Sequence, residues 1–524
     1  MKKTATFGII HIGSIHTSMA IVNYHSPTNI EIIESANKEI PLGEEVFRTH
    51  HLSFASIHEL CHILQGFRQL LLDYRVDEVY PIATTVIREA ENRLGILDLL
   101  YMRTGFRFHV ADMTEEVYYK FFALHHFLKE DEHVGTKPTL LLDVTSGGLG
   151  FTGWQDSTLL FQTNVTGGRL SVLEHFTEEE RVSVMFPAAV RDYLHASLSS
   201  LWPRIEHADI HTLVLTGFEA RILVSHLSGG APGTTQYPAV IDPEKFLEIT
   251  ESLMPLTTHK LMQAFEISER RAQLLLPTLL LYEEVVRTLH IDTILVMNTT
   301  FLYGYAAWCG AQRISPKAIS EQADLLLDLA RSTAMRYNCN LPHISRIDEY
   351  ATKLFDGLRR VHGLSTRHRL LLRMSALLHE TGKFVNLRNY PLHSWQIIMG
   401  TDIFGITDAE KEVIACISYY YHRDNPGKKD MHYQRLTQEQ KIVADKCCAI
   451  LRLADALDQG HSGRIQSLAV RLVKEKLYVN YTSEYDISLI RWSFAQASTL
   501  PRNLRHRACL KEEITWTSTI ANII

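Results

Sequence analysis

Hydrophobic and polar positions alternate in two different ways along this chain. In the first three hundred residues, short apolar runs typical of strands alternate with amphipathic helical segments. From about Gln312 to Gly460 the periodicity is that of long helices, and residues 466–481, SLAVRLVKEKLYVNYT, then alternate as two short strands. The pattern predicts an α/β region, a helical region and a small C-terminal α/β unit.

Two segments of the α/β region predict similar β-hairpins. GIIHIGSIHTSMAIVNY and TLLLDVTSGGLGFTGWQDSTLLFQTNV each run from an apolar strand through a Ser/Gly-containing turn into a second strand. Turns of this kind can arrange backbone N–H groups around a phosphate. The sequence therefore predicts an anion site near the two turns.

Between and after the hairpins the pattern alternates strands and helices. It predicts a strand VYPIATTVI, a helix from Arg88 to Arg103, a strand FRFHVA and a helix that starts near Asp112. Asp112 and Glu115 have capping-box spacing ahead of the apolar run VYYKFFALHHFL, which fixes that helix start. Two later apolar segments, TLVLTG and DTILVMN, are further predicted strands.

The length of the chain implies several domains. Hydrophobic cores stop growing at roughly 250–300 residues, and this chain has 524. Hydrophobic residues make up 46% and charged residues 21%, which is ordinary for a folded protein and excludes a largely disordered one. The charged loop KEDEHVGTKP gives the first boundary, near residue 130.

The beginning of the chain resembles a secretory signal only superficially. His11 and His16 interrupt its apolar stretch, which fits a strand, a turn and a second strand better. LLLPTLLLY is far shorter than the roughly 20 apolar residues of a membrane span and contains Pro277. We therefore expect a cytoplasmic protein without a membrane span.

Cysteine content and charge exclude other classes of protein. Seven cysteines, with Cys447 and Cys448 adjacent and no CxxC pair, favour reduced thiols over a disulfide framework or a zinc ribbon. A net charge of -6 implies that any anion site is local. The basic segment PRNLRHRACLK, residues 501–511, lacks interleaved aromatic residues, so we expect no specific nucleic-acid partner and interpret it as a solvated face or, alternatively, a polyanion groove.

One stretch resembles a known family. ATTVIREAENRLGILDLLYMRTGFRFHVADMTEEV is similar to the Ala-Thr strand, Arg-x-Ala-x-Asn helix, Thr-Gly turn and Glu-Glu helix start of the exopolyphosphatase and guanosine pentaphosphate phosphohydrolase family, relatives of actin, Hsp70 and sugar kinases. LLHETGKFVNLRNYPLHSWQIIMGTDIFGIT and YYYHRDNP resemble the helical HD-like extension of its long members. The resemblance implies two actin-like lobes, 1–130 and 131–311, an HD-like domain, 312–464, and a small α/β unit, 465–524.

The resemblance also implies roles for individual residues. Arg88 matches the arginine that holds phosphate, Glu116 matches the catalytic base, and Asp143 matches the aspartate that opens the second phosphate loop and helps to hold Mg²⁺. Phosphoanhydride cleavage needs such a base and positive groups around the phosphoryl oxygens. Phosphate contacts would also come from the two hairpin turns, at Gly13, Ser14, Ser146, Gly147 and Gly148.

Each of these residues also has a structural explanation. Glu116 can pair with Lys120 one helical turn later, and Arg88 can pair with Glu91 or Asn92 on a helix face. Gly147 and Gly148 can be plain turn residues. Asp143, at the end of an apolar strand, is a site candidate from its position alone, because ligands bind outside the carboxyl ends of strands.

The chain departs from the family pattern at three loops. The family's Asp-x-Gly-Ser-Asn-Ser becomes His11, Ile12, Gly13, Ser14, Ile15 and His16. Its Asp-x-Gly-Gly-Gly-Ser-Thr-Glu becomes Asp143, Val144, Thr145, Ser146, Gly147, Gly148, Leu149 and Gly150, and its Leu-Arg-Glu-Gly becomes Phe301, Leu302, Tyr303 and Gly304. The lost charges weaken Mg²⁺ binding more than phosphate binding by backbone amides.

A second candidate site lies in the helical region. His343, His379, Glu380 and Asp455 follow the order of a divalent-metal HD site, with Glu380 in place of an aspartate, and His393 and His422 could add contacts. The extra methylene of Glu380 displaces its carboxylate from the ideal position. We favour a metal-free structural or anion-lining role over a metal site.

Two functions therefore follow from the resemblance. The first is a Mg²⁺-assisted hydrolase that removes terminal phosphate from polyphosphate or guanosine pentaphosphate, with a homodimer as its expected assembly. The second, favoured by the missing loop carboxylates, is a catalytically silent protein that binds phosphate, polyphosphate or a nucleotide and regulates a partner. Hydrolysis by the HD-like domain alone is a third possibility and would require a bound metal.

Overall fold

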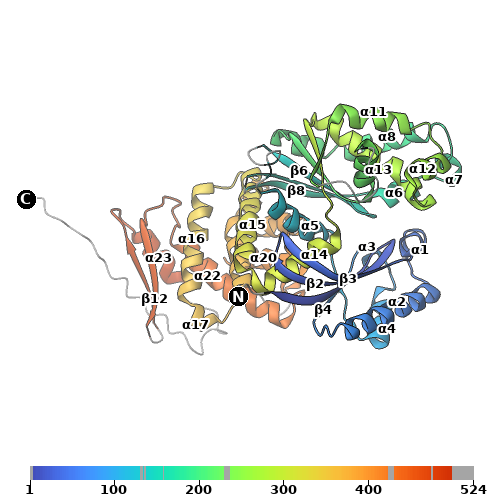
Figure 1. Cartoon of the computed structure of the whole chain (residues 1–524). Coiled ribbons are helices and arrows are strands. Elements are labelled where there is room, and N and C mark those ends of the chain that lie inside the picture. Colours follow the sequence, from blue (N-terminus) through green and yellow to red (C-terminus); the bar gives the residue numbers. More distant parts are fainter. Residues whose placement is uncertain are drawn as a thin grey trace, which may run out of the picture. The chain divides into compact units, whose positions relative to one another are not determined.

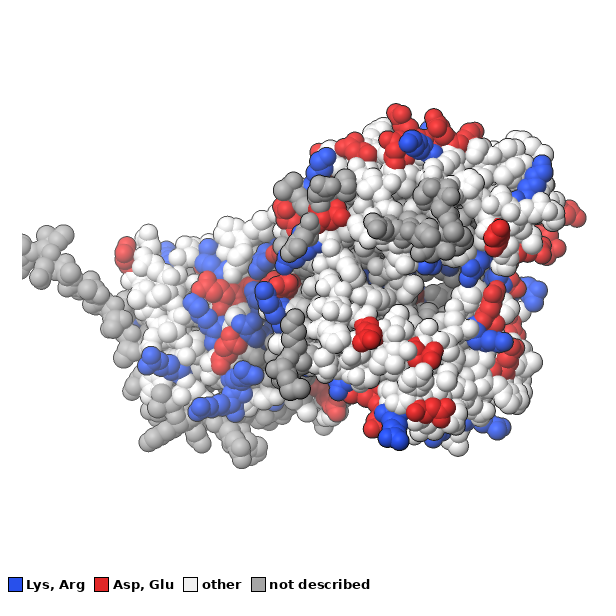
Figure 2. Space-filling model, viewed as in Figure 1, with Lys and Arg blue, Asp and Glu red and all other residues white. Residues whose placement is uncertain are grey.

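The computed structural model divides the chain into two compact units, Met1–Leu325 and Leu326–Ile524 (Figure 1). It describes residues 4–129, 131, 134, 137–156, 158–228, 237–422, 430–473 and 476–497. The basic segment 501–511 lies outside these residues. On the face drawn in Figure 2, positive and negative side chains are interspersed, in keeping with the small net charge.

The first sheet of unit 1 has the strand order β3-β2-β1-β4-β5. The predicted first hairpin is confirmed as β1 (Ala5–Ile12) and β2 (His16–Ser26), which pair antiparallel, and β3 (Asn29–Glu39) extends the sheet at one edge. On the other side, β4 (Val79–Ala83) and the short β5 (His109–Val110) run parallel to β1. Its helices are α1 (Leu42–Thr49), α2 (Phe54–Asp73), α3 (Thr85–Arg88), α4 (Arg93–Thr104) and α5 (Met113–Leu128).

The second sheet of unit 1 has the order β10-β11-β9-β6-β7-β8. The predicted second hairpin is confirmed as β6 (Thr139–Val144) and β7 (Gly148–Gln155), continued by β8 (Thr158–Thr166). Its remaining strands are β9 (Thr212–Leu215), β10 (Ala239–Ile241) and β11 (Thr293–Val296). The helices around it are α6 (Arg169–Glu174), α7 (Glu178–Arg181), α8 (Phe186–Leu198), α9 (Trp202–Ile205), α10 (Phe218–Ser228), α11 (Pro243–Leu253), α12 (Thr258–Phe265) and α13 (Glu269–Leu289), with a short 3₁₀ turn at Glu206–Ala208.

Helix α14 (Phe301–Ile314) returns from the second sheet to the first. It packs against α5, β1 and β2, as Figure 1 shows. Two glycines permit the close approach: a Cβ at Gly304 would meet the backbone of Tyr119, and one at Gly310 would meet the Tyr24 ring at 2.2 Å. α14 thereby brings the loop at Phe301 against the first hairpin.

Two predictions about secondary structure in the first lobe are wrong in detail. The predicted helix from Arg88 to Arg103 begins only at Arg93, as α4, because Arg88 ends α3 with its guanidinium bonded to Glu116 of α5 and Asn92 bonds to the backbone of Leu52. The predicted strand VYPIATTVI ends at Ala83, and only His109–Val110 of FRFHVA pairs in the sheet. In both places tertiary contacts override the local pattern.

Unit 2 is mostly helical, as the pattern predicts. α15 (Pro316–Arg336) crosses the boundary between the units. Unit 2 continues through α16 (Leu341–Gly357), α17 (Arg359–His362), α18 (Thr366–Leu378), the 3₁₀ turn Thr381–Phe384, α19 (Tyr390–Met399), α20 (Asp408–Tyr420), α21 (Met431–Gln434) and α22 (Gln438–Ala456). The predicted strand pair is confirmed as β12 (Ser467–Val473) and β13 (Lys476–Thr482), followed by α23 (Ser488–Ala497).

The cysteines and the helix lengths bear on the earlier expectations. Six of the seven cysteines lie in described residues, and all six are free. In the described parts of the chain, no helix is both long and apolar enough to cross a membrane.

Candidate functional site

A pocket of about 470 Å³ lies between the two sheets of unit 1. The turn of the first hairpin and the turn of the second contribute to its walls, and so do α5, α13 and the start of α14. The predicted site residues that line it are Gly13, Ser14, Glu116 and Ser146.

Glu116 lies in the first turn of α5, and its position follows from the helix cap. The predicted capping box is present: the Asp112 side chain accepts from the N–H of Glu115, and the Glu115 carboxylate accepts from the N–H of Asp112. Glu115 also bonds to His109 and Tyr119, so it is committed to the local structure. The next residue, Glu116, is left to face the pocket.

Arg88 is the partner of Glu116. Its Nη1 donates to Glu116 Oε1 at 2.6 Å and to the carbonyl oxygen of Ala111 at 2.7 Å. Thr85 Oγ1 lies 3.5 Å from the same carboxylate oxygen. The neighbouring partners considered from the sequence, Glu91 and Asn92 for Arg88, are therefore not the ones that hold it.

Burial raises the pKa of Glu116, since its side chain is almost fully removed from solvent. The positive charges of Arg88 and Lys120 act in the opposite direction, and the negative charge of Asp143 adds to the rise. A carboxylate whose pKa is raised is a stronger base than an exposed one.

Lys120, one turn after Glu116, pairs with Asp143 instead of Glu116. Lys120 Nζ lies 2.5 Å from Asp143 Oδ1, and the Asp143 side chain is only 1% exposed. Asp143 Oδ2 is buried and has no hydrogen-bond partner. Two acidic residues of the predicted site, Glu116 and Asp143, are thus each neutralised by a cation of the same chain.

Strand β1, just before the first hairpin turn, carries an uncharged histidine, His11, at the position that matches the family's aspartate. His11 Nε2 lies 3.1 Å from Thr84 Oγ1, and the imidazole ring lies 4.5 Å from the Phe301 ring, centroid to centroid. Desolvation, with smaller effects of Lys120 and His16, lowers the pKa of His11 to about 3. His11 is therefore neutral at ordinary pH.

Some backbone N–H groups of the two hairpin turns donate hydrogen bonds to other atoms of the same turn. The N–H of Gly13 donates to the carbonyl of His16 at 3.0 Å, and the N–H of Gly148 donates to Thr145 Oγ1 at 3.0 Å. Gly147 and Gly148 pack closely: a Cβ would meet Thr85 Cγ2 at 2.8 Å and Met113 Cε at 2.5 Å, respectively. Close packing therefore explains why glycine stands at both positions, independently of any phosphate bound at the turn.

Three arginines of the pocket were not singled out from the sequence. Arg169 Nη1 lies 2.6 Å from Glu219 Oε1, Arg221 donates to Asn298 Oδ1 at 2.7 Å, and the guanidinium carbon of Arg271 lies 3.8 Å from the centre of the Phe218 ring. Arg169 follows two glycines, Gly167 and Gly168, after the second hairpin. This glycine pair could have indicated Arg169 as a candidate site residue from the sequence. Arg221 and Arg271 come from helices α10 and α13, whose position beside the pocket is decided by packing.

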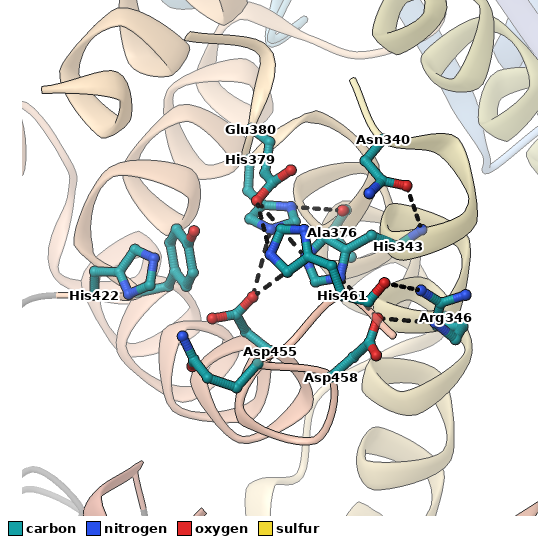
Figure 3. A network of polar contacts seen from close by, with 12 residues as sticks. Asn340, His343, Arg346, Ala376, His379, Glu380, His422, Asp455, Asp458 and His461 are labelled. Atoms are coloured by element: carbon teal, nitrogen blue, oxygen red, sulfur yellow. Dashed lines mark hydrogen bonds and ion pairs between the residues drawn. The ribbon is translucent and has the colours of Figure 1, made fainter. Parts of the chain in front are cut away.

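The predicted residues of unit 2 lie together in the helical bundle (Figure 3). His343 of α16, His379 and Glu380 after α18, and Asp455 of α22 approach one another, with His343 Nε2 3.6 Å from both Glu380 Oε1 and Asp455 Oδ1. His343, His379 and Glu380 have ligand atoms within 4.8 Å of one another.

The two additional histidines considered from the sequence have other contacts. His393 Nδ1 lies 2.9 Å from Gln396 Oε1, and His422 Nε2 contacts the Tyr390 hydroxyl. Two residues that the sequence did not indicate, Asp458 and His461, adjoin His343 instead.

Comparisons with known proteins agree with this architecture. Residues 20–301, more than half of the chain, match the Ppx/GppA phosphatase family. Residues 329–498 match domain III of the Ppx/GppA phosphatases. Guanosine-5'-triphosphate,3'-diphosphate pyrophosphatase of Aeromonas hydrophila is 33% identical over 126 residues, which are 24% of this chain. The chain thus spans only a quarter of the length of that curated relative, 25%.

Solved structures share the fold of the first unit. The Ppx/GppA family member of Aquifex aeolicus has a TM-score of 0.51 at 17% identity and covers 59% of this chain and 99% of its own. An exopolyphosphatase from Cytophaga hutchinsonii has a TM-score of 0.52 at 15% identity and covers 59% of this chain and 98% of its own. The expected two-lobed, actin-like fold is confirmed, and the chain belongs to the Ppx/GppA phosphatase family.

Proposed function

We propose that the pocket of unit 1 binds the terminal phosphoryl group of polyphosphate or guanosine pentaphosphate and hydrolyses its phosphoanhydride bond. The observation that carries this proposal is the position of Glu116, a buried carboxylate with a raised pKa, on the wall of a pocket that Lys120 and three arginines also line. An anionic substrate would be attracted by the cations, and the base would face a water molecule beside it.

In this mechanism Glu116 accepts a proton from water while the water oxygen bonds to the terminal phosphorus. The bridging oxygen leaves with the shortened chain or with the nucleotide, and the proton returns to solvent from Glu116. Arg88 is not among the residues that line the pocket, and its role here is to hold the base in place through its 2.6 Å contact. Lys120 and Arg271 would offset the negative charge that the phosphoryl group carries.

The residues of this pocket do not fit the Mg²⁺ that the family resemblance implies. Mg²⁺ requires near-octahedral oxygen ligands at about 2.0–2.1 Å. Asp143 and Glu116 already have an ammonium and a guanidinium at hydrogen-bond distance, and the first hairpin turn offers the imidazole of His11 where the family has a carboxylate. We therefore assign the charge-neutralising role to the resident cations and derive no step through Mg²⁺.

Phosphate release from long-chain polyphosphate and from guanosine pentaphosphate, with and without Mg²⁺, tests this function. Glu116→Gln keeps the size of the side chain and removes the base, so release should fall by about 10²–10⁴-fold while substrate affinity changes little. Glu91→Gln, at an exposed carboxylate of the same unit that pairs with His51, is the matched control and should leave the rate unchanged. A Glu116→Gln variant as fast as the unmodified protein would eliminate the mechanism.

A second function, binding without turnover, is favoured by one observation. Both acidic residues of the predicted site are paired with internal cations, and such pairing makes a carboxylate less available to accept a proton from water. In that case the unmodified protein releases no phosphate, but Arg271→Ala, which removes a cation of the pocket wall, still weakens polyphosphate binding. Binding should also weaken as salt rises, because cations such as Arg221 and Arg271 release counterions from the polyanion.

A further inference from the structure

We propose, in place of the metal-free role favoured from the sequence, that His343 and His379, together with the carboxylates of Asp455 and Glu380, bind one divalent first-row transition ion within unit 2. The family match over residues 329–498 names no metal in this domain. The contacts among these four side chains support such an ion. They do not depend on the function proposed for unit 1.

The two imidazoles are completely buried, and one nitrogen of each is unpaired. His343 and His379 are 0% exposed, and the Nε2 atom of each has no hydrogen-bond partner. A buried imidazole nitrogen without a partner costs free energy unless something satisfies it. The two unpaired atoms lie toward the same group of carboxylates, as Figure 3 shows.

The opposite nitrogen of each ring is fixed in a way that leaves the Nε2 lone pair available. His343 Nδ1 lies 2.8 Å from Asp458 Oδ2, and His379 Nδ1 lies 2.7 Å from the carbonyl oxygen of Ala376. Both acceptors require a proton on Nδ1. Neutral rings in this tautomer present bare Nε2 atoms, which is the arrangement that metal-binding histidines commonly use.

The distances across the centre suit a bridging ion better than direct hydrogen bonds. His343 Nε2 lies 3.6 Å from Asp455 Oδ1 and from Glu380 Oε1, and His379 Nε2 lies 3.8 Å from Asp455 Oδ1. Hydrogen bonds between nitrogen and oxygen are shorter, about 2.7–3.2 Å. Two ligands that each lie about 2.0–2.2 Å from one metal ion are separated by roughly 3–4 Å.

The donor set selects the class of ion. Imidazole nitrogen with carboxylate oxygen suits zinc, manganese, iron or cobalt, whereas Mg²⁺ and Ca²⁺ prefer oxygen ligands alone. Lys383 Nζ contacts Glu380 Oε1 and competes with an ion for that oxygen. Asp455, which has the two Nε2 atoms as its close neighbours, is therefore the principal carboxylate ligand, and Glu380 the secondary one.

A supporting layer holds the ligands in place. Asp458 is 1% exposed and accepts from Arg346 Nε at 2.8 Å and from the N–H of Gly463 at 2.9 Å, in addition to its contact with His343. The His461 ring is stacked on His343 with centroids 3.7 Å apart. Asp458 is thus a positioning residue for His343, in the manner of carboxylate–histidine–metal arrangements.

The competing occupant of this centre is a proton. An imidazolium at His343 would neutralise part of the charge of Asp455, Asp458 and Glu380, but its nearest carboxylate oxygens on the Nε2 side remain 3.6 Å away. It would also leave the Nε2 atom of His379 without a donor. One metal ion satisfies both nitrogens.

Elemental analysis of the full chain, purified without a histidine tag, tests the proposal. We expect about one transition-metal ion per chain after dialysis against Zn²⁺, Mn²⁺ or Co²⁺, and at least a tenfold lower occupancy for His379→Asn. His393→Asn is the matched control, because His393 belongs to the same unit and bonds to Gln396, and it should keep its metal. Asp458→Asn should weaken affinity by about 10–100-fold without abolishing binding.

Two further measurements keep the proposal open to refutation if His379→Asn does not fold. Asp455→Asn should lose metal in the same way, and Co²⁺ added to the unmodified protein should give visible absorption bands that a chelator removes. Occupancy below about a tenth of an ion per chain in the unmodified protein, or equal occupancy in the ligand variants, would overturn the metal site and leave the protonated cluster.

Discussion

The pocket of unit 1 and the histidine cluster of unit 2 differ in how their buried polar side chains are paired. In unit 1, Glu116 has the Arg88 guanidinium at 2.6 Å and Asp143 has the Lys120 ammonium at 2.5 Å. In unit 2, the Nε2 atoms of His343 and His379 face Asp455 at 3.6 and 3.8 Å, and neither has a hydrogen-bond partner.

In unit 1 each of these buried carboxylates has a cation of the chain beside it, although Asp143 Oδ2 has no hydrogen-bond partner, whereas in unit 2 the two buried Nε2 atoms have no partner within the chain. Paired buried charges are stable only while both partners remain, since removing one leaves an uncompensated charge. Unpaired buried nitrogens cost free energy, and the metal ion proposed for unit 2 would satisfy two of them at once. Unit 1 should therefore be sensitive to substitution of its own cations, and unit 2 to removal of an external ion.

The largest expected effect comes from Lys120→Met. It leaves the Asp143 carboxylate, which is 1% exposed, without its cation, so the free energy of unfolding should fall by about 3–5 kcal/mol in urea titrations. Lys129→Met, at a pair that is half exposed, should cost less than about 1 kcal/mol. Adding Asp143→Asn to Lys120→Met should recover part of the loss; equal losses for the single and double variants would show that Asp143 is not charged.

Removal of metal should destabilise unit 2 selectively. If an ion binds the His343 centre at a concentration about 100 times its dissociation constant, it contributes about 2.7 kcal/mol, and a chelator should lower the unfolding temperature of unit 2 accordingly. The measurement is thermal unfolding with hydrogen exchange resolved by region. The unfolding temperature of unit 1 serves as the internal control. If the chelator lowered the unfolding temperature of unit 2 equally in His379→Asn, the stabilisation would not come from an ion at the His343 centre.

A smaller effect should follow from Asp112→Ala at the start of α5. The substitution removes one half of the capping box that places Glu116, at a cost of about 1 kcal/mol in the free energy of unfolding. Thr177→Ala removes the cap of α7, a four-residue helix with no buried residues, and should change global stability by only a few tenths of a kcal/mol. If both substitutions lowered the free energy of unfolding by the same amount, the cap at Asp112 would not contribute to the packing of α5.

The smallest effect should be a pH dependence that originates at His11. Its pKa is lowered to about 3 in the folded state from an ordinary value of 6.5, so the unfolded state binds the proton more readily between these values. Its contribution to stability is present above about pH 6.5 and is lost as the pH falls toward 3, and the loss amounts to about 0.8 kcal/mol at pH 6. His11→Asn cannot titrate and should flatten the urea-midpoint profile between pH 5.5 and 7.5; an unchanged slope would exclude His11 as the source.

Elements that depend on near neighbours could be predicted from the sequence. The alternation around Gly13 and Gly147 predicts both hairpins, and the spacing of Asp112 and Glu115 predicts the cap of α5; the two-lobed fold is predicted from the family resemblance alone. Caps, turns and periodicity are decided within a few residues along the chain. They can therefore be predicted without knowledge of packing.

The partners of the buried charges, in contrast, depend on how distant segments pack against one another. Lys120 is one helical turn from Glu116, yet it pairs with Asp143 of the second sheet, and Arg88 turns from its own helix to α5. α14 returns to the first sheet because Gly304 and Gly310 allow close contact there. These partners come from separate segments, and their distances are fixed by how sheets and helices pack, which the local pattern of side chains does not encode.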